Sequence, residues 1–251
     1  MKSLIVVLAA FALVVACGGG TETTASRSPI PPGPVTKYRD MVPGLNAAAS
    51  IDLIQNVIDF APGAASVVHT HGSPNLATVL EGQITVKMAA ADKHANAGDL
   101  LVEPINQPVQ ALNSGSGEAM VVVGFAVPHG GKPTVAVKGK PAPSIANKTL
   151  YSFTLASANV SGPYSLVQQV FDFAPGAQTP KQQRGGPGVI TVLQGQVALD
   201  ADGVETTYNA GDSFTELPGQ TLQAFNRGTS DLILAATFAL PDGAQLTTNV
   251  Q

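Results

Sequence analysis

The sequence repeats itself at a fixed distance of 113 residues. Val57–Ala64 reads V-I-D-F-A-P-G-A, and Val170–Ala177 reads V-F-D-F-A-P-G-A. The same separation relates Gly82 to Gly195, Gly98 to Gly211, Asn113 to Asn226, Phe125 to Phe238, and Pro128 to Pro241. One separation that holds over so long a span, with no insertion, predicts that a single fold is used twice.

Each copy has the pattern of a β domain. Short apolar and β-branched runs are separated by turn signals such as Pro62-Gly63 and Asn113–Gly117. The predicted strands are Asp52–Phe60, Ala77–Leu80, Gln83–Met88, Asp99–Val102 and Met120–Val127, then Leu166–Phe173, Val189–Leu193, Gln196–Leu199, Asp212–Thr215 and Leu232–Ala239. Apolar residues nowhere keep a helical period over a long stretch. The sequence therefore predicts an all-β chain, with two barrels packed about a pseudo-two-fold axis.

The N-terminus has the features of a targeting signal. Lys2 precedes the apolar run Leu4–Ala16, which is shorter than the roughly 20 residues of a membrane-spanning helix. Leu13–Cys17 resembles a bacterial lipobox, in which the cysteine becomes the lipidated first residue of the mature protein. We expect a lipoprotein signal over residues 1–16, lipidation of Cys17, and attachment to a membrane of a bacterial cell envelope on its extracytoplasmic face. The alternative is a signal cut after a small residue, with Cys17 incidental.

Composition divides the rest of the chain. Residues 17–42 are rich in Gly, Thr, Ser and Pro and predict a flexible tether. We expect a first barrel over 43–138, a linker over 139–150 and a second barrel over 151–251. The net charge of −4 and the lack of a basic cluster argue against nucleic acid as a partner. The state of oligomerisation stays open.

Two spaced series in the first copy point to a family. The first series is Gly63, His69, His71, Asn75 and Gly82, and the second is Gly98, Pro104, Asn106, Val109 and Asn113. These spacings resemble the two cupin motifs, G-x5-H-x-H-x3,4-E-x6-G and G-x5-P-x-G-x2-H-x3-N. The second copy keeps most of the glycines and the final Asn226. The resemblance implies two tandem jelly-roll barrels, a bicupin, over nearly all of the mature chain.

The resemblance also implies a divalent metal ion held by three histidines and a glutamate. His69 and His71 remain, and their i, i+2 spacing places both on one face of a strand. Asn75 replaces the glutamate, and Val109 replaces the third histidine. We expect at most one ion, Fe, Mn, Ni, Cu or Zn, in the first barrel. The alternative is a hydrogen-bonded histidine pair in a polar pocket without metal.

Glu103 offers a substitute carboxylate, which would give a two-histidine, one-carboxylate set. Its counterpart Glu216 has no histidine beside it, which favours a structural role such as accepting backbone N–H groups. His94 lies in a polar turn and His129 follows Pro128. Either is a ligand only if the barrel brings it inward.

The second copy has Gln182 and Arg184 where the first has histidines, and Leu222 where the first has Val109. We therefore expect no metal in the second barrel. Arg184 either holds an anionic ligand by a bidentate contact or lies in water at the barrel mouth. Asn75, Gln182 and Arg184 are the candidate ligand-binding residues.

Three functions fit this pattern. The first is an envelope-anchored protein that binds a small organic ligand. The second, implied by the resemblance, is a metal-dependent quercetinase-like dioxygenase or a related cupin oxidoreductase. The third is a structural protein whose sites have decayed. The missing ligands at positions 75 and 109 favour the binding role over the enzyme.

Overall fold

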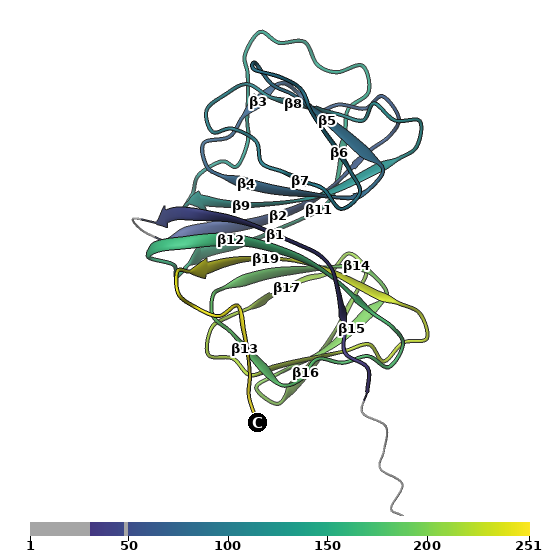
Figure 1. Ribbon diagram of the computed structural model, residues 1–251, viewed down its shortest axis with the longest axis vertical. Coiled ribbons are helices and arrows are strands. Elements are labelled where there is room, and N and C mark those ends of the chain that lie inside the picture. Colours follow the sequence, from purple (N-terminus) through teal and green to yellow (C-terminus); the bar gives the residue numbers. More distant parts are fainter. Residues whose placement is uncertain (1–30, 48–49) are drawn as a thin grey trace, which may run out of the picture. The chain divides into compact units, whose positions relative to one another are not determined.

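The computed structural model describes residues 31–47 and 50–251. The expected signal, Cys17 and residues 17–30 of the expected tether lie outside this range. Across the described residues the regular elements are β-strands (Figure 1). A search of the same residues finds no helix with the length and hydropathy needed to cross a membrane.

The first repeat contributes strands β1 to β10. They are β1 (Val35–Ala47), β2 (Ile51–Phe60), β3 (His69–Thr70), β4 (Asn75–Glu81), β5 (Gln83–Lys87), β6 (Lys93–Asn96), β7 (Leu100–Leu101), β8 (Gln110–Leu112), β9 (Ala119–Pro128) and β10 (Val135–Ala136). Each of the five strands predicted for this copy overlaps an observed one. The short strands β3, β6, β8 and β10 and the longer β1 were not predicted, because their apolar residues are too few or too irregular to show a period.

The second repeat contributes strands β11 to β20. They are β11 (Lys148–Ala158), β12 (Gly162–Phe173), β13 (Gln182–Arg184), β14 (Gly188–Gln194), β15 (Gln196–Ala201), β16 (Val204–Asn209), β17 (Ser213–Glu216), β18 (Leu222–Phe225), β19 (Leu232–Pro241) and β20 (Thr247–Asn249). The five strands predicted for this copy are also confirmed, so the chain is the all-β tandem fold that the repeat predicted.

Two five-stranded sheets form the centre of the molecule. Their orders are β11-β2-β9-β4-β7 and β1-β12-β19-β14-β17, so equivalent strands occupy equivalent places. The two sheets pack against each other, and the outer sheets close one barrel above and one below (Figure 1). The outer sheet of the second barrel is continuous, β16-β15-β18-β13-β20, whereas that of the first is divided into β6-β5-β8 and β10-β3.

The repeats exchange their first strands. β1 pairs with β12 of the second barrel, from Val35 opposite Asp172 to Ala47 opposite Gly162. β11 pairs with β2 of the first barrel, and Lys148 lies opposite Asp59. Each barrel is therefore completed by a strand from the other repeat.

This exchange corrects two expected boundaries. Residues 35–42, assigned to the tether, form most of β1, and residues 148–150, assigned to the linker, begin β11. β1 is an edge strand that contains Pro43 and Gly44, and its side chains are mostly exposed or half-buried. Such a strand needs no apolar alternation, so its composition resembled that of a linker.

Reciprocal hydrogen bonds join the two barrels across the central sheets. Gln55 Nε2 donates to Thr191 Oγ1 at 2.8 Å, and Thr78 Oγ1 donates to Gln168 Oε1 at 2.7 Å. Gln55 and Gln168 are equivalent positions of the repeat, and so are Thr78 and Thr191. Equivalent surfaces of the two barrels therefore contact each other, as a two-fold axis requires.

At the pseudo-two-fold axis there is room for a side chain from only one of the two repeats. Gly124 and Thr237 are equivalent positions, yet a Cβ atom on Gly124 would lie 2.5 Å from the Thr237 methyl group. Two threonines would collide there. The glycine on one side and the threonine on the other show that the duplicated halves have adapted to a shared interface.

The shared turn motif has a structural reason. Gly63 and Gly176 adopt positive φ angles of 76° and 78°, a region that glycine occupies without steric cost. Asn113 donates to the carbonyl oxygen of Phe60 at 2.8 Å, and Asn226 donates to that of Phe173 at 2.8 Å. These contacts close the same corner of each barrel, so both copies retain the turn although their interiors differ.

Candidate metal centre in the first barrel

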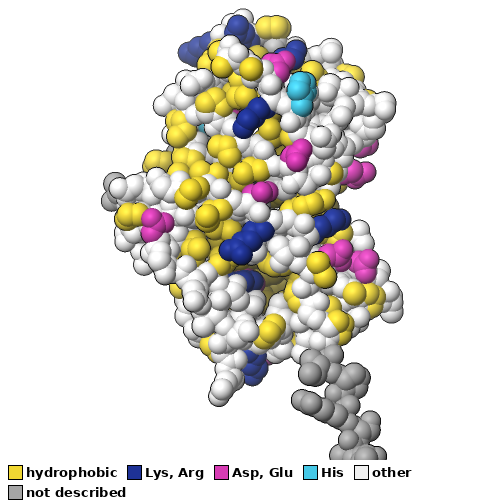
Figure 2. Space-filling view, in the orientation of Figure 1, with side chains coloured by type: hydrophobic (Ala, Val, Ile, Leu, Met, Phe, Trp, Pro, Cys, Tyr) yellow, Lys and Arg dark blue, Asp and Glu magenta, His cyan; other side chains and the backbone are white. Residues whose placement is uncertain are grey.

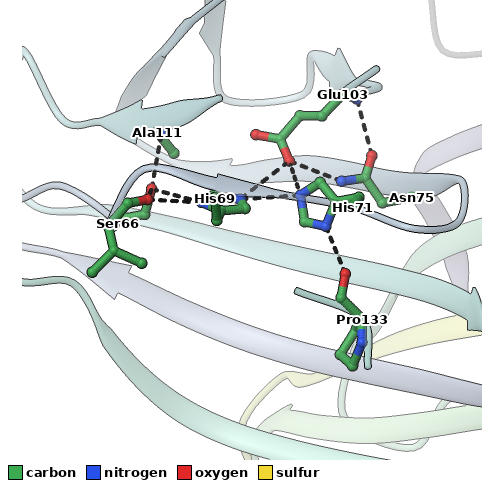
Figure 3. Close-up of polar contacts among 8 residues, drawn as sticks. Ser66, His69, His71, Asn75, Glu103, Ala111 and Pro133 are labelled. Carbon is green, nitrogen blue, oxygen red and sulfur yellow. Dashed lines mark hydrogen bonds and ion pairs between the residues drawn. The ribbon is translucent and has the colours of Figure 1, made fainter. Parts of the chain in front are cut away.

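His69 and His71 lie on and directly after β3, and their imidazoles point to one place inside the first barrel (Figure 3). Their Nε2 atoms are 3.1 Å apart. Both residues are buried, with 6% and 2% of their surface exposed. The i, i+2 spacing therefore places both imidazoles on the same face, as strand geometry predicts.

Glu103 brings a carboxylate to the same place. It lies two residues after β7, and its Oε2 is 2.6 Å from Nε2 of His71 and 3.9 Å from Nε2 of His69. One ligand atom from each of the three residues lies within 4.8 Å of the others. The structure thus brings the three candidate ligands His69, His71 and Glu103 together, although comparison with Glu216 had favoured a structural role for Glu103.

Backbone carbonyl groups fix the orientation of both rings. Nδ1 of His69 lies 2.8 Å from the carbonyl oxygen of Val67, and Nδ1 of His71 lies 2.7 Å from that of Pro133. A carbonyl oxygen only accepts, so each Nδ1 donates its proton. In neutral rings both Nε2 lone pairs would then face each other and the carboxylate, and either a metal ion between them or a proton on one Nε2 atom removes this repulsion.

The donor set fits a first-row transition metal. Two nitrogen ligands at about 2.1 Å from one ion lie about 3 Å apart when they are adjacent, close to the 3.1 Å between the histidine Nε2 atoms. Two imidazoles and one carboxylate match the ligands of non-haem iron sites and suit several divalent ions. The carbonyl groups of Val67 and Pro133, which the sequence analysis did not identify, supply the outer contacts that such histidines usually make.

Asn75 occupies the place of the usual glutamate, but it contacts Glu103. Its Nδ2 donates to Glu103 Oε2 at 2.8 Å, and its Oδ1 accepts from the backbone N–H of Glu103 at 3.0 Å. Both ends of this fully buried amide are therefore occupied. Asn75, a candidate ligand-binding residue from its position in the sequence, holds the carboxylate in place, because its side chain spans the gap between β4 and the segment that follows β7.

The charges of the centre support one another. Burial raises the pKa of Glu103, but hydrogen bonds from His69 and His71 and their charges outweigh burial and lower this pKa to about 2. Burial lowers the pKa of His69, but the hydrogen bond and charge of Glu103 and the bond to Val67 raise it overall. Glu103 is thus a carboxylate at neutral pH, in the ionisation state that a metal ligand requires.

The other candidate positions lie outside the centre. Val109 stands opposite His69 in a backbone bridge and is buried, so the place of the third histidine is apolar. His94 hydrogen-bonds to Thr85 at 2.8 Å on β6, and His129 pairs with Asp52 at 2.8 Å. Neither histidine is brought inward to the candidate ligands.

A cavity of about 350 Å³ adjoins His69, His71 and Glu103. Its other walls are mostly apolar and include Ile58, Phe60, Ala77, Ile84, Val121, Val123 and Phe125. The exchanged strand β11 adds Thr149, so the second repeat helps to enclose this site. Asn56 also lines the cavity, and its buried Oδ1 has no hydrogen-bond partner among the described residues. The cavity therefore suits a small, mainly apolar molecule that carries a hydrogen-bond donor.

Comparison with known proteins agrees with this geometry. The chain matches the cupin domain family twice, over residues 56–125 and 169–238, which together exceed half of its length. The chain belongs to the cupin family. The two matches are separated by the repeat distance and make it a bicupin. No curated protein matches the sequence.

Solved structures share the fold of this bicupin at low sequence identity. Oxalate decarboxylase from Bacillus subtilis has a TM-score of 0.60 and 15% identity, over 87% of this chain and 79% of that chain. AerE from Microcystis aeruginosa has a TM-score of 0.54 and 16% identity, over 83% of this chain and 98% of that chain. The decarboxylase has Mn(II) centres. At such identities the likeness extends to the fold alone.

The second cupin barrel has an ion pair where the first has the candidate metal ligands. Nε of Arg184 donates to Oε2 of Glu216 at 2.5 Å, and Nη1 donates to Thr247. The guanidinium also lies 5.0 Å from the ring centre of Phe238. Arg184 is only 8% exposed, so the interpretation that it lies in water is wrong. The carboxylate of Glu216, for which the sequence offered only backbone partners, requires this buried cation as a counter-charge.

Proposed function

We propose that the first barrel is a metal-dependent site for a small organic ligand, with one divalent ion held by His69, His71 and Glu103. One observation carries the proposal. Both Nδ1 atoms donate to carbonyl oxygens, so once the rings are neutral both Nε2 lone pairs converge beside a carboxylate. Fe, Mn, Ni, Cu and Zn are the ions that this donor set accepts.

The surroundings of the centre support a ligand beside the ion. Three protein ligands leave coordination positions open, and the apolar cavity of about 350 Å³ adjoins them. A divalent metal there would supply Lewis acidity and, for Fe, Mn or Cu, redox chemistry. The chain itself excludes water with apolar walls, orients the ligand through Asn56, and holds Glu103 in place through Asn75.

Metal content tests the proposal. The purified full chain is stripped with chelator, reloaded with each of the five ions, dialysed and measured by mass spectrometry. We expect about one ion per chain for the native sequence and none for His69→Gln/His71→Gln. The matched control is His94→Gln/His129→Gln, which removes the other two histidines and should retain the ion. Equal metal in both variants, or none in the native chain, would overturn the proposal.

An oxidoreductase of the quercetinase-like type, or a related cupin enzyme, is the second candidate. The observation that favours it is the two-histidine, one-carboxylate set, which resembles that of iron oxygenases that react with O₂. Oxygen uptake by the metal-loaded chain, measured with flavonols and with small dicarboxylates such as oxalate, distinguishes the candidates. Uptake or product formation that is lost in His69→Gln/His71→Gln supports the enzyme, and ligand binding without turnover supports the binding protein.

We also propose that Cys17 anchors the bicupin to a membrane on the extracytoplasmic face of a bacterial envelope. The support is the lipobox-like run Leu13–Cys17. Fractionation of cells that express Cys17→Ser tests it. The variant should stay unprocessed or leave the membrane fraction, and a variant that is processed and anchored like the native chain would contradict the anchor.

A further inference from the structure

The second barrel contains a cavity of about 690 Å³, nearly twice the volume of the first. Its inner walls are apolar and include Phe171, Phe173, Ile190, Leu234 and Leu246. Residues at the start of the exchanged strand β1 border it as well. In Figure 2 the lower half of the molecule is hollowed, and apolar and basic side chains line the hollow. A volume of this size accommodates a small organic molecule.

The charges around the cavity favour an anion. Glu216 is the one acidic residue among the described residues that line it, and Arg184 neutralises this carboxylate at 2.5 Å. Arg39, on β1, adds an exposed positive charge. The lining therefore carries a net positive charge, which attracts an anionic molecule toward the opening.

Two buried side chains in the cavity have unused hydrogen-bonding groups. Arg184 uses Nε for Glu216 and Nη1 for Thr247, and its Nη2 has no partner among the described residues. Gln182 is 6% exposed, and its side-chain amide makes no hydrogen bond to any residue in that part of the chain. Neither group is among the fully buried unpartnered atoms of the described residues, so both are accessible from the cavity that they line. The guanidinium and amide N–H groups, two residues apart on β13, match the two oxygens of a carboxylate.

We propose that the second barrel binds a small organic carboxylate with an apolar body, and that it does so without a metal ion. Arg184 and Gln182 contact the carboxylate, and the aromatic and aliphatic walls enclose the body of the molecule. Glu216 holds the guanidinium in position through Nε. The site is independent of the centre in the first barrel, because none of its lining residues belongs to that centre.

Calorimetric titration of the full chain in excess chelator tests the proposal. The probe is 2-naphthoate, and 2-naphthalenemethanol is the neutral probe of nearly the same shape. A charge-assisted hydrogen bond to a buried guanidinium predicts that the carboxylate binds about 10- to 100-fold more tightly than the alcohol. Saturable binding of one carboxylate per chain, with this preference, is the expected result. Absence of saturable binding of 2-naphthoate, or equal binding of the two probes, would overturn it.

Variants on β13 locate the site. Gln182→Leu leaves the ion pair intact and should weaken 2-naphthoate binding by about 3- to 10-fold. Gln183→Leu is the matched control, because Gln183 bonds to Thr221 at 3.3 Å and does not line the cavity. Equal affinity of the two variants would contradict the assignment.

The charged pair is tested as a unit. Arg184→Met/Glu216→Leu removes both charges together, which avoids a buried unpaired ion. This variant should bind the alcohol but lose the preference for the carboxylate. If the folded variant still prefers the carboxylate to the alcohol, the carboxylate does not bind at Arg184. Should the double variant fail to fold, Gln182→Leu against Gln183→Leu still decides the assignment.

Discussion

The two barrels hold the same buried carboxylate with different cations. Glu103 in the first barrel faces two imidazoles whose Nε2 atoms converge, whereas Glu216 in the second faces the guanidinium of Arg184. The positions are equivalent in the repeat and in the sheets. A buried carboxylate at this place of the fold needs a positive charge. In the second barrel a permanent side-chain cation supplies it, and in the first barrel the proposed exchangeable ion would do so.

The difference has chemical consequences. An imidazole pair can release its proton and accept a metal ion, so the charge in the first barrel depends on what is bound. A guanidinium keeps its proton and blocks the place that an ion would take. The barrel with histidines is therefore suited to metal chemistry, and the barrel with arginine is suited to holding an anion.

The largest expected effect comes from converting the second barrel into a copy of the first. Gln182→His/Arg184→His places two imidazoles beside Glu216, and the carbonyl groups of Pro180 and Leu246 occupy the positions equivalent to those of Val67 and Pro133. We expect bound metal to rise from about one to about two ions per chain, measured by mass spectrometry. The same change in a Glu216→Gln background should add no tightly bound ion. A folded double-histidine variant that stays at one ion would show that the carboxylate and two imidazoles are insufficient.

Removal of the buried carboxylate should destabilise the protein by different amounts in the two barrels. Glu216→Gln leaves Arg184 buried with its charge unpaired, and we expect a loss of about 3–5 kcal/mol in the free energy of unfolding. Glu103→Gln in chelator should cost only about 1–3 kcal/mol, because the imidazoles can become neutral. Denaturant unfolding of both variants under the same conditions measures the difference. Equal losses of unfolding free energy in the two variants would show that the ability of the imidazoles to become neutral makes no difference to stability.

The Asn75 contact sharpens the comparison within the first barrel. Asn75→Leu removes both hydrogen bonds to Glu103 and should weaken metal affinity by about 10- to 100-fold, as loss of outer-shell partners does. The second barrel has Gly188 at this position, where a Cβ atom would collide with Phe238. Competition with a metal-sensitive dye gives the affinity. If the Asn75→Leu variant has the same unfolding temperature as the native chain and also the same metal affinity, Asn75 does not position Glu103.

The smallest expected effect is a dependence on acid at one position of the repeat where only the first barrel has a titratable side chain, Asp52. Asp52 accepts hydrogen bonds from His129, Ser157 and Gly130, and the bonds from His129 and Ser157 outweigh burial and lower its pKa to about 2. The equivalent position in the second barrel is Ser165, which does not titrate. Because an unfolded aspartate titrates near pH 4, this contribution is complete above about pH 4 and is lost as pH falls toward 2.

The acid effect is measured against Asp52→Asn. The native chain should lose about 1 kcal/mol more than the variant between pH 4 and 2, a value reduced because the His129 side chain is exposed. Chemical unfolding at several pH values gives the two curves. Parallel curves would show that Asp52 is not stabilised as a carboxylate.

Much of the fold could be predicted from the sequence. The repeat distance, the turns at Gly63 and Gly176, and the long strands of each copy all depend on residues close together in the chain. The direction of His69 and His71 was equally predictable, since alternate residues of a strand share a face. Strands β3, β10 and β20 escaped prediction because two or three residues do not establish a period.

The rest depended on contacts between distant segments. The exchange of β1 and β11 was not predictable, because an edge strand with Pro43 and Gly44 has the composition of a linker. Asn75 seemed a poor metal ligand, and only the fold shows that it contacts Glu103. Arg184 seemed free to lie in water, and only barrel closure buries it against Glu216.

The amino-acid sequence is enough to predict that one β fold occurs twice and that only the first copy carries paired imidazoles on one strand face. Those properties are local, set by spacing along the chain. Three features become evident only in the folded chain: which strands complete each barrel, that Glu103 reaches His71 across 32 residues, and that Arg184 supplies the counter-charge to Glu216. Closure of a barrel brings distant segments together, and no local period of a sequence records where they meet.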